Sequence, residues 1–176
     1  MKEMTAENAM FLLHGVYLPA LKNESQLTKK VIEAVPADKS DYRPDPISKS
    51  AIEMVRHIAA ADVHFLEAVI TGQFSKGAVL VPAELKTPAE IAAWYEQRHA
   101  AKTEALTELT GEQLIKIVNF RGPFQQPAVM WLMLGLHHTI HHRGQLSSYL
   151  RSMGAKVPSI YGESYDAEQA RKAAQA

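Results

Sequence analysis

The stretch PAVMWLMLGLHHTIHHRGQLSSYLRSMG, residues 127–154, combines a long apolar run with four histidines in six positions. Pro127 suits the first turn of a helix, where its missing N–H is not needed, and Gly154 suits the left-handed residue that ends one. Between them, apolar residues recur at helical spacing. We therefore predict a long helix that begins at Pro127, ends near Met153 and packs against other helices.

Two more helices are predicted from the N-terminal half of the chain. Residues 5–35 have helical periodicity, interrupted at Pro19, where we expect a kink or a short break. A turn-rich connector with three prolines follows. Ser48 or Ser50 can then cap the next helix, and Gly72 is expected to end it.

A further helix has a clear start after the loop of residues 73–86. Thr87 is a suitable cap, Pro88 fits the first helical position, and Glu90 completes a capping box. We expect this helix to run to about Leu109, with Gly111 just past its end.

The remaining segments are short. Residues 114–127 predict a short extended piece or hairpin before the last long helix, and the tail predicts a short terminal helix after Ser164. Four long helices with almost no strand indicate an all-α, up-down four-helix bundle. The chain has no internal repeat, flexible linker or composition break, so we expect a single domain over residues 1–176.

Composition excludes several classes of function. Lys plus Arg and Asp plus Glu each number 19, so we expect no basic face that binds nucleic acid. The absence of Cys removes disulfides, thiolate zinc sites and cysteine nucleophiles. His14 breaks the N-terminal apolar run, which makes a poor signal peptide, and no stretch approaches the about 18 apolar residues of a membrane span. We expect a cytoplasmic protein without membrane or nucleic-acid partners.

The four clustered histidines form two pairs at helical spacing, His137 with His141 and His138 with His142. Residues four apart lie one turn apart on one face of a helix, so either pair can reach a single metal ion. The row through His138 and His142 joins apolar bulk to groups that can orient a ligand: Trp131, Leu134, Gln145 and Tyr149. The row through His137 and His141 is also partly apolar, so helix geometry favours the first pair without excluding the second.

A third ligand is expected from another helix, and His57 is the candidate. It lies on a largely apolar stripe of the helix that includes Met54, Ala61, His64, Phe65 and Ala68. The small residues around His57 leave room for a metal or ligand. His64 lies two turns further, about 10 Å along the helix. A lone inward histidine is also a common hydrogen-bonded core residue, so the stripe alone leaves both interpretations of His57 open.

The motif HxxxHRGQLSSYLRSMG followed by VPSIYG, from His138 to Gly162, resembles the last helix and following loop of the DinB-like, damage-inducible family. The segment YRPDPISKSAIEMVRHIAAADVHFL, residues 42–66, resembles that family's second helix and the turn before it. The resemblance implies a DinB-like up-down bundle that holds a divalent metal, zinc or nickel, on His57, His138 and His142. It also implies a homodimer.

Relatives in this family include thiol-dependent transferases and isomerases that use bacillithiol, mycothiol or glutathione. The resemblance therefore implies a metal-dependent thiol S-transferase, or a hydrolase, that acts on small electrophiles with a low-molecular-weight thiol as cofactor. Three imidazoles would leave an open coordination position, as catalytic zinc sites do. The alternative is a non-catalytic, stress-associated metal-binding dimer.

Neighbouring polar residues are candidates for orienting the histidines. We expect Gln145, Tyr149 or Asp62 to do so, although Asp62 also fits an ordinary acid on a helix surface. Helix geometry directs Arg143 away from the metal, where it can pair with an acid of the third helix or of the tail.

The last long helix carries apolar residues nearly all round. They are Leu132, Leu136, Leu146 and Leu150 on one side and Val129, Met133 and Ile140 on another. A helix at the edge of a bundle should expose a polar face, so the excess predicts a second interface. A symmetric homodimer is the commonest arrangement of that kind.

Overall fold

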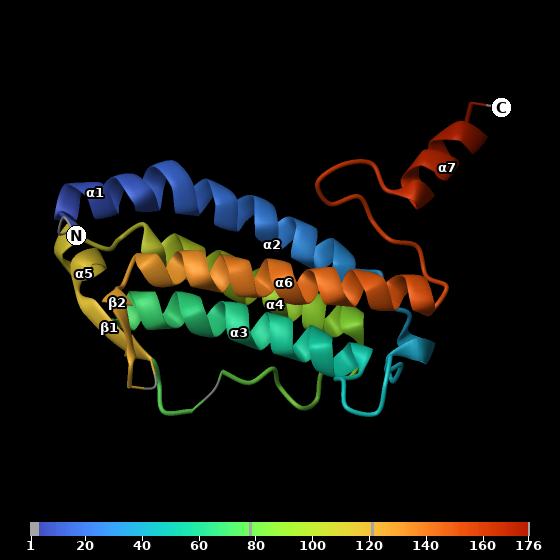
Figure 1. Cartoon of the computed structure of the whole chain (residues 1–176), viewed down its shortest axis with the longest axis horizontal. Coiled ribbons are helices and arrows are strands. Elements are labelled where there is room, and N and C mark those ends of the chain that lie inside the picture. The colour runs from blue at the N-terminus through green and yellow to red at the C-terminus, as the bar shows by residue number, and fades with distance from the viewer. Residues whose placement is uncertain (1–3, 78, 121, 176) are drawn as a thin grey trace.

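The computed structural model describes residues 4–77, 79–120 and 122–175, and within them four long helices lie side by side (Figure 1). The first is continuous through three segments, α1 (Ala6–Phe11), the π-helical η1 (Leu12–Tyr17) and α2 (Leu18–Glu33). The others are α3 (Ala51–Thr71), α4 (Pro88–Leu106) and α6 (Met130–Ser152). Shorter elements are the 3₁₀ turn η2 (Ala37–Lys39), α5 (Gly111–Ile115) and α7 (Tyr165–Ala173). The prediction of an all-α fold is confirmed.

The break expected at Pro19 is replaced by the π-helical segment just before it. Pro19 lies in the first turn of α2, and a proline ring clashes with the carbonyl four residues earlier in a regular α-helix. A π-helical turn widens the helix locally, which accommodates the ring without ending the helix. The residues that flank the π segment on both sides keep helical dihedral angles.

Helix ends follow the capping signals at most positions. Ser50, rather than Ser48, caps α3 through a capping box with Glu53, and Thr87 caps α4 with Glu90 in the same way. The expected end of α4 was wrong, because Gly111 begins α5 instead of following α4. A Cβ at Gly111 would lie 2.8 Å from the carbonyl oxygen of Ala6, so a close contact with α1 explains this glycine.

The long helices are not strictly alternating in direction, because the connection between α3 and α4, of which residues 72–77 and 79–87 are described, returns along the bundle before α4 begins (Figure 1). Contacts between α3 and α4 show that these two helices run parallel. Asp62 lies beside His99, and further along both helices Glu67 pairs with Lys102. The helix formed by α1, η1 and α2 is parallel to α6, and these two run opposite to α3 and α4 (Figure 1). The segment 72–87 therefore lies along one side of α3.

The short extended segment before the last helix is a hairpin of β1 (Ile117–Phe120) and β2 (Phe124–Pro127), as predicted. The indole Nε1–H of Trp131 donates to the carbonyl of Val118 at 3.2 Å, which fastens the hairpin to α6. Pro127 ends β2, so α6 begins three residues later than expected. No described helix is both long and apolar enough to cross a membrane.

Among the described residues, the apolar core falls into two clusters at opposite ends of the bundle. One is built around Leu13, Leu66 and Trp131 and the other around Ile32, Ile58 and Leu150. Along each of α2, α3, α4 and α6, buried polar side chains separate the residues of one apolar cluster from those of the other. They are Ser25, Thr28, Asp62, His99, Thr139 and Arg143. The expectation that Asp62 is a surface acid was wrong, because its carboxylate is buried and accepts a hydrogen bond from Tyr95 at 2.6 Å.

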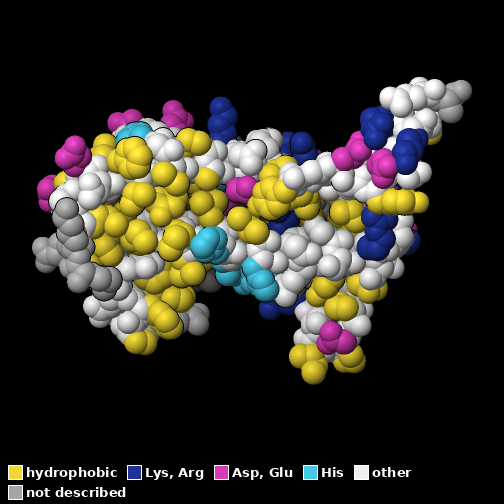
Figure 2. Space-filling model, turned by 45° about the horizontal axis from the view of Figure 1, so that its top comes forward, with side chains coloured by type: hydrophobic (Ala, Val, Ile, Leu, Met, Phe, Trp, Pro, Cys, Tyr) yellow, Lys and Arg dark blue, Asp and Glu magenta, His cyan; other side chains and the backbone are white. Residues whose placement is uncertain are grey.

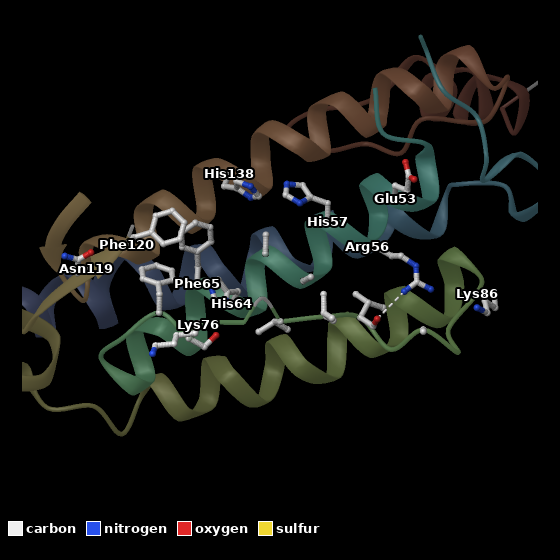
Figure 3. Close-up of a pocket in the computed structure, with 18 residues that line it drawn as sticks. Glu53, Arg56, His57, His64, Phe65, Lys76, Lys86, Asn119, Phe120 and His138 are labelled. Atoms are coloured by element: carbon white, nitrogen blue, oxygen red, sulfur yellow. Dashed lines mark hydrogen bonds between the residues drawn. The ribbon is translucent and has the colours of Figure 1, made fainter. Parts of the chain in front are cut away.

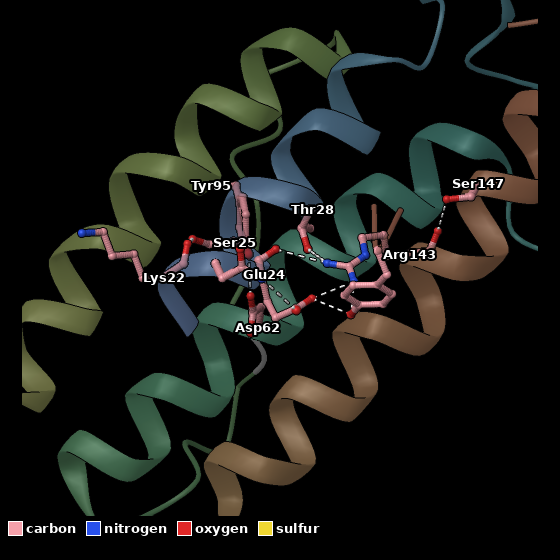
Figure 4. Close-up of polar contacts among 10 residues, drawn as sticks. Lys22, Glu24, Ser25, Thr28, Asp62, Tyr95, Arg143 and Ser147 are labelled. Carbon is pink, nitrogen blue, oxygen red and sulfur yellow. Dashed lines mark hydrogen bonds and ion pairs between the residues drawn. The ribbon is translucent and has the colours of Figure 1, made fainter. Parts of the chain in front are cut away.

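Arg143 has the most extensive contacts in this polar layer (Figure 4). Its guanidinium donates to the backbone carbonyl of Glu24 and to the side-chain hydroxyl of Thr28, both on α2 and each at 3.2 Å. It also forms an ion pair with the Glu24 carboxylate at 2.7 Å. The hydroxyl of Tyr161, in the loop after α6, accepts from the same guanidinium and donates to Glu24 at 2.8 Å. Arg143 points away from His142 as expected, but its acidic partner is on the first helix.

The bundle should depend strongly on the Glu24 carboxylate. Glu24→Ala leaves the buried guanidinium without its counter-charge, and breaking a buried pair in this way costs about 3 kcal/mol or more of unfolding free energy. Urea denaturation measures the loss. Glu33→Ala on the same helix removes only an exposed ion pair to Lys29 and is the matched control, with an expected effect below about 0.5 kcal/mol. Equal stability of the two variants would contradict this role for Glu24.

Candidate metal centre

His57 of α3 and His138 and His142 of α6 meet on the side of the bundle where these helices pack together. One ring nitrogen from each lies within 4.8 Å of the others, and all three side chains are half-buried. The Nε2 atoms of His57 and His142 are 3.2 Å apart, and the rings of His138 and His142 have centroids 4.4 Å apart. The structure thus brings together the three histidines named from the sequence.

The rotation of α6 separates its two histidine pairs. His138 and His142 face α3, whereas His137 and His141 are exposed on the outer side of the helix. Because the buried Leu132, Leu136 and Leu146 fix which face of α6 is inward, the outer pair cannot reach His57 without turning the helix.

The spacing of two of the ring nitrogens fits the tetrahedral coordination of zinc. With Zn–N bonds of about 2.0–2.1 Å, two ligand nitrogens lie roughly 3.3 Å apart, close to the 3.2 Å between His57 and His142. The buried Nδ1 of His138 has no hydrogen-bond partner among the described residues. A buried nitrogen without a partner lowers the stability of the fold, so a ligand that satisfies the His138 ring would be favourable.

Gln145 orients one of the rings, as predicted. Its side-chain oxygen lies 2.7 Å from Nδ1 of His142, which places the proton on Nδ1 and leaves the Nε2 lone pair directed towards His57. The other two candidates contact different partners. Tyr149 packs edge-on against Tyr42, and Asp62 bonds to Tyr95 on the far side of α3.

Burial and mutual repulsion keep the three imidazoles neutral. Burial, then the neighbouring His142 and His57, lowers the pKa of His138 to about 4. Burial also lowers the pKa of His57 and of His142, in the latter case against the opposing effect of the Gln145 hydrogen bond. Neutral imidazole is the metal-binding form, so protons compete weakly for this site at neutral pH.

A cavity of 1080 Å³ opens beside the histidines (Figure 3). His57 and His138 are part of its wall, α3 forms one side, and the returning segment 72–87 forms much of the other. Arg56 fastens that segment to α3 by donating to the carbonyls of Val81, Pro82 and Leu85. The metal centre is therefore reached from a space large enough for a small molecule.

An aromatic cluster at one end of the cavity was missed in the sequence. Phe65 of α3, Phe74 of the returning segment and Phe120 of β1 come together there, and the Phe65 ring lies 5.7 Å from the His138 ring. The three residues lie on separate elements, so no local spacing marks them as neighbours. Asn119, next to Phe120, lines the same end.

The low pKa of His138 predicts a pH-dependent stability of the metal-free protein. The folded-state pKa of about 4 lies below the unfolded value of 6.5, so the unfolded chain takes up the proton first as pH falls. This contribution is fully present above pH 6.5 and is lost between pH 6.5 and 4. Urea unfolding in the presence of chelator should show a shallower pH dependence in His138→Gln. The exposed His137→Gln is the control, and identical slopes in the two variants would refute the assignment.

Comparisons with known proteins agree with this fold. The Bacillus subtilis protein YjoA is 30% identical over 131 residues, which cover 73% of this chain and 82% of YjoA. The B. subtilis protein YrdA is 41% identical over 73 residues, 41% of this chain and 43% of YrdA.

Solved structures extend the comparison. The crystal structure of DinB-like YjoA superposes with a TM-score of 0.68 at 24% identity over 83% of this chain and 98% of that one. A DinB-like protein of Bacillus cereus gives a TM-score of 0.64 at 27% identity, covering 82% and 95%. A variant of mycothiol-dependent maleylpyruvate isomerase shares the fold, with a TM-score of 0.56 at 13% identity over 83% and 63%. The model described as the DinB family matches residues 4–173, and the chain belongs to that family.

Proposed function

We propose that this protein is a metal-dependent enzyme in which His57, His138 and His142 hold one divalent ion, zinc or nickel. The observation that carries the proposal is the convergence of three neutral imidazoles, two of which, His57 and His138, form part of the wall of a 1080 Å³ cavity. Three protein ligands would leave at least one coordination position open, and two of the three histidines border the cavity. A structural zinc site would instead be closed by a fourth protein ligand.

The reaction class proposed is thiol transfer to a small electrophile. A divalent ion held by neutral ligands keeps its full charge and lowers the pKa of a bound thiol or water towards neutrality. The chain has no Cys, so the thiol must come from a small molecule. In the transfer, the sulfur forms a bond to the electrophilic carbon while the thiol proton and the leaving group depart. A hydrolase would use water in the same position.

Thiol chemistry is consistent with the fold comparison, since a mycothiol-dependent isomerase has this fold at 13% identity. It also suits a cytoplasmic location, which we propose with it, because low-molecular-weight thiols are kept reduced there. The alternative, a non-catalytic metal-binding dimer, requires neither a cavity nor an open position. The cavity therefore favours the enzyme.

The proposed metal is not needed to hold the fold. Among the described residues, the two apolar core clusters contain none of the three histidines. A domain of this size buries enough apolar surface to fold without a metal, unlike a chain of about 40 residues. The ion is therefore available for chemistry.

The ligand assignment predicts which histidine variants lose metal. Elemental analysis of untagged protein should give ~1 equivalent per chain. His138→Ala or His142→Ala should lose most of it, whereas the exposed His137→Ala and His141→Ala should not. Gln145→Leu should weaken affinity about tenfold through the orientation of His142. Full metal retention in His138→Ala would exclude this site.

The reaction class predicts thiol-dependent turnover. Zinc- or nickel-loaded protein, incubated with a chromogenic chlorodinitrobenzene and with bacillithiol, mycothiol or glutathione in turn, should form the thioether faster than the buffer control. His142→Ala and chelated protein should not. A stoichiometrically loaded protein that is inactive with every thiol would support the non-catalytic alternative.

We also propose a homodimer, although not for the reason taken from the sequence. Leu132, Leu146 and Leu150 of α6, and Val129 just before it, are buried in the chain's own core, so these residues are not available to a partner. Hydrophobic side chains nevertheless cover a broad area over α1 and α6 (Figure 2). The exposed large hydrophobic residues of α1, of η1 directly after it, and of α6 are Phe11, Val16, Met133 and Leu134. Large exposed apolar patches of this kind are typical of interfaces.

A dimer through this surface should be sensitive to charge on it. Light scattering at micromolar concentration should report twice the chain mass of 19.5 kDa. Met133→Glu should shift the mass to that of the monomer, because it would bury a carboxylate in an apolar interface. Glu84→Gln, in the loop before α4, is the control. A wild-type mass of 19.5 kDa would refute the dimer.

A further inference from the structure

We propose that the cavity beside the histidines binds a small organic anion with a flat, apolar body. Its volume of 1080 Å³ is slightly above the range of about 300–1,000 Å³ for small-molecule sites. As the substrate class of the proposed enzyme, this inference rests on the proposed function for what happens to the bound molecule. The binding itself depends only on the lining of the cavity.

The apolar body is assigned to the aromatic end of the cavity. The Phe74 ring lies 4.6 Å from Phe120 and 5.8 Å from Phe65, measured between centroids, so the three form a continuous wall. Phe65 also meets the ring of His138 at 5.7 Å, which continues this wall to the metal centre. Flat rings bind aromatic walls by stacking or edge contacts in addition to apolar burial. A planar molecule placed here lies beside the proposed metal.

The negative charge is assigned from the ionisable residues of the lining. Arg56, Lys76 and Lys86 are cationic, against the single carboxylate of Glu53, which is itself paired with Arg43 at 2.9 Å. Neither lysine has an ion-pair partner among the described residues. The chain as a whole has equal numbers of acidic and basic residues, so this cationic lining is local. A cavity with low-dielectric walls and charge of one sign concentrates ligands of the other.

Lys76 is the residue that we assign to the anionic group. It lies at the aromatic end of the cavity with Phe65 and Phe120, whereas Lys86 lies at the far end beyond Arg56 (Figure 3). A carboxylate on Lys76 leaves the attached ring against the aromatic wall, within the part of the cavity that His138 borders. Lys76 and the aromatic wall together select molecules that have both an anionic group and a flat, apolar body.

Three probes separate these contributions: naphthoate, its neutral amide naphthamide, and acetate. Calorimetric titration of the full-length chain, both metal-free and zinc-loaded, should show naphthoate binding three- to fivefold more tightly than naphthamide, about the effect of one partly exposed ion pair. The preference should shrink at about 1 M NaCl, where charges are screened beyond about 3 Å. Acetate should not bind to the metal-free chain. Equal affinity for naphthoate and naphthamide would overturn the proposal.

Matched variants locate the site. Lys76→Gln should remove the preference for naphthoate and leave naphthamide unchanged, whereas Lys30→Gln, on the exposed face of α2, should change neither. Ala60→Phe fills the cavity from α3 and should abolish binding of both probes, with the exposed Ala93→Phe of α4 as its control. Unchanged binding in Lys76→Gln or Ala60→Phe would overturn the assignment.

Metal content measured on the same samples keeps the two proposals apart. Stoichiometric metal without probe binding would overturn this inference alone. Probe binding to a chain that cannot be loaded with zinc or nickel would overturn the proposed metal centre and leave the anion site supported.

Discussion

A buried guanidinium at mid-height of the bundle limits how its helices can be arranged. Arg143 lies between two apolar clusters, and its charge is balanced by Glu24 and by oxygen acceptors from α2 and the loop after α6. Taking a charge out of water is costly unless nearly every donor finds a partner. An apolar core tolerates small slips between helices, but this pair does not, since a shift of one turn would leave a charge buried alone. The register of α6 against α2 is thereby specified.

The same constraint reaches the candidate metal centre, because Arg143 and His142 are adjacent in sequence and face different helices, α2 and α3. Once the arginine faces α2, the rotation of the helix turns His138 and His142 towards α3. The histidines then lie beside His57, and Gln145 sets the orientation of the ring of His142. Preorganised ligands of this kind lose little entropy when they bind a metal. The adjacent residues His142 and Arg143 thus link the stability of the bundle to the geometry of the histidine site.

The sequence predicted those parts of the molecule that local chemistry controls. Capping boxes at Ser50 and Thr87, and glycines such as Gly72, fixed helix ends to within a few residues because each signal acts over one turn. The histidine pair on α6 could be found by spacing alone. The prediction that Gly111 follows the end of α4 was wrong, because the contact that requires this glycine comes from α1, about a hundred residues away in sequence.

Features that depend on tertiary packing could not be predicted in this way. Asp62 looked like a surface acid, because only the folded bundle places it against Tyr95. The aromatic wall is assembled from α3, β1 and the segment before α4, and its members carry no common spacing. The excess of leucines on α6 is used by the chain's own core, which periodicity cannot distinguish from an interface with a second copy.

The return of residues 72–87 along α3 has a consequence for how such a protein can diversify. One wall of the cavity is irregular chain, held to the bundle by the Arg56 contacts and by the packing of Phe74 and Val81, whereas the histidines lie on helices. Loops accept substitutions and length changes at little cost to the folding of the elements they join. The shape and charge of the cavity can therefore change over evolutionary time, or in a directed library, while the ligand geometry is inherited intact. A bundle of this topology is a scaffold on which one set of histidines can stand beside cavities of many different shapes.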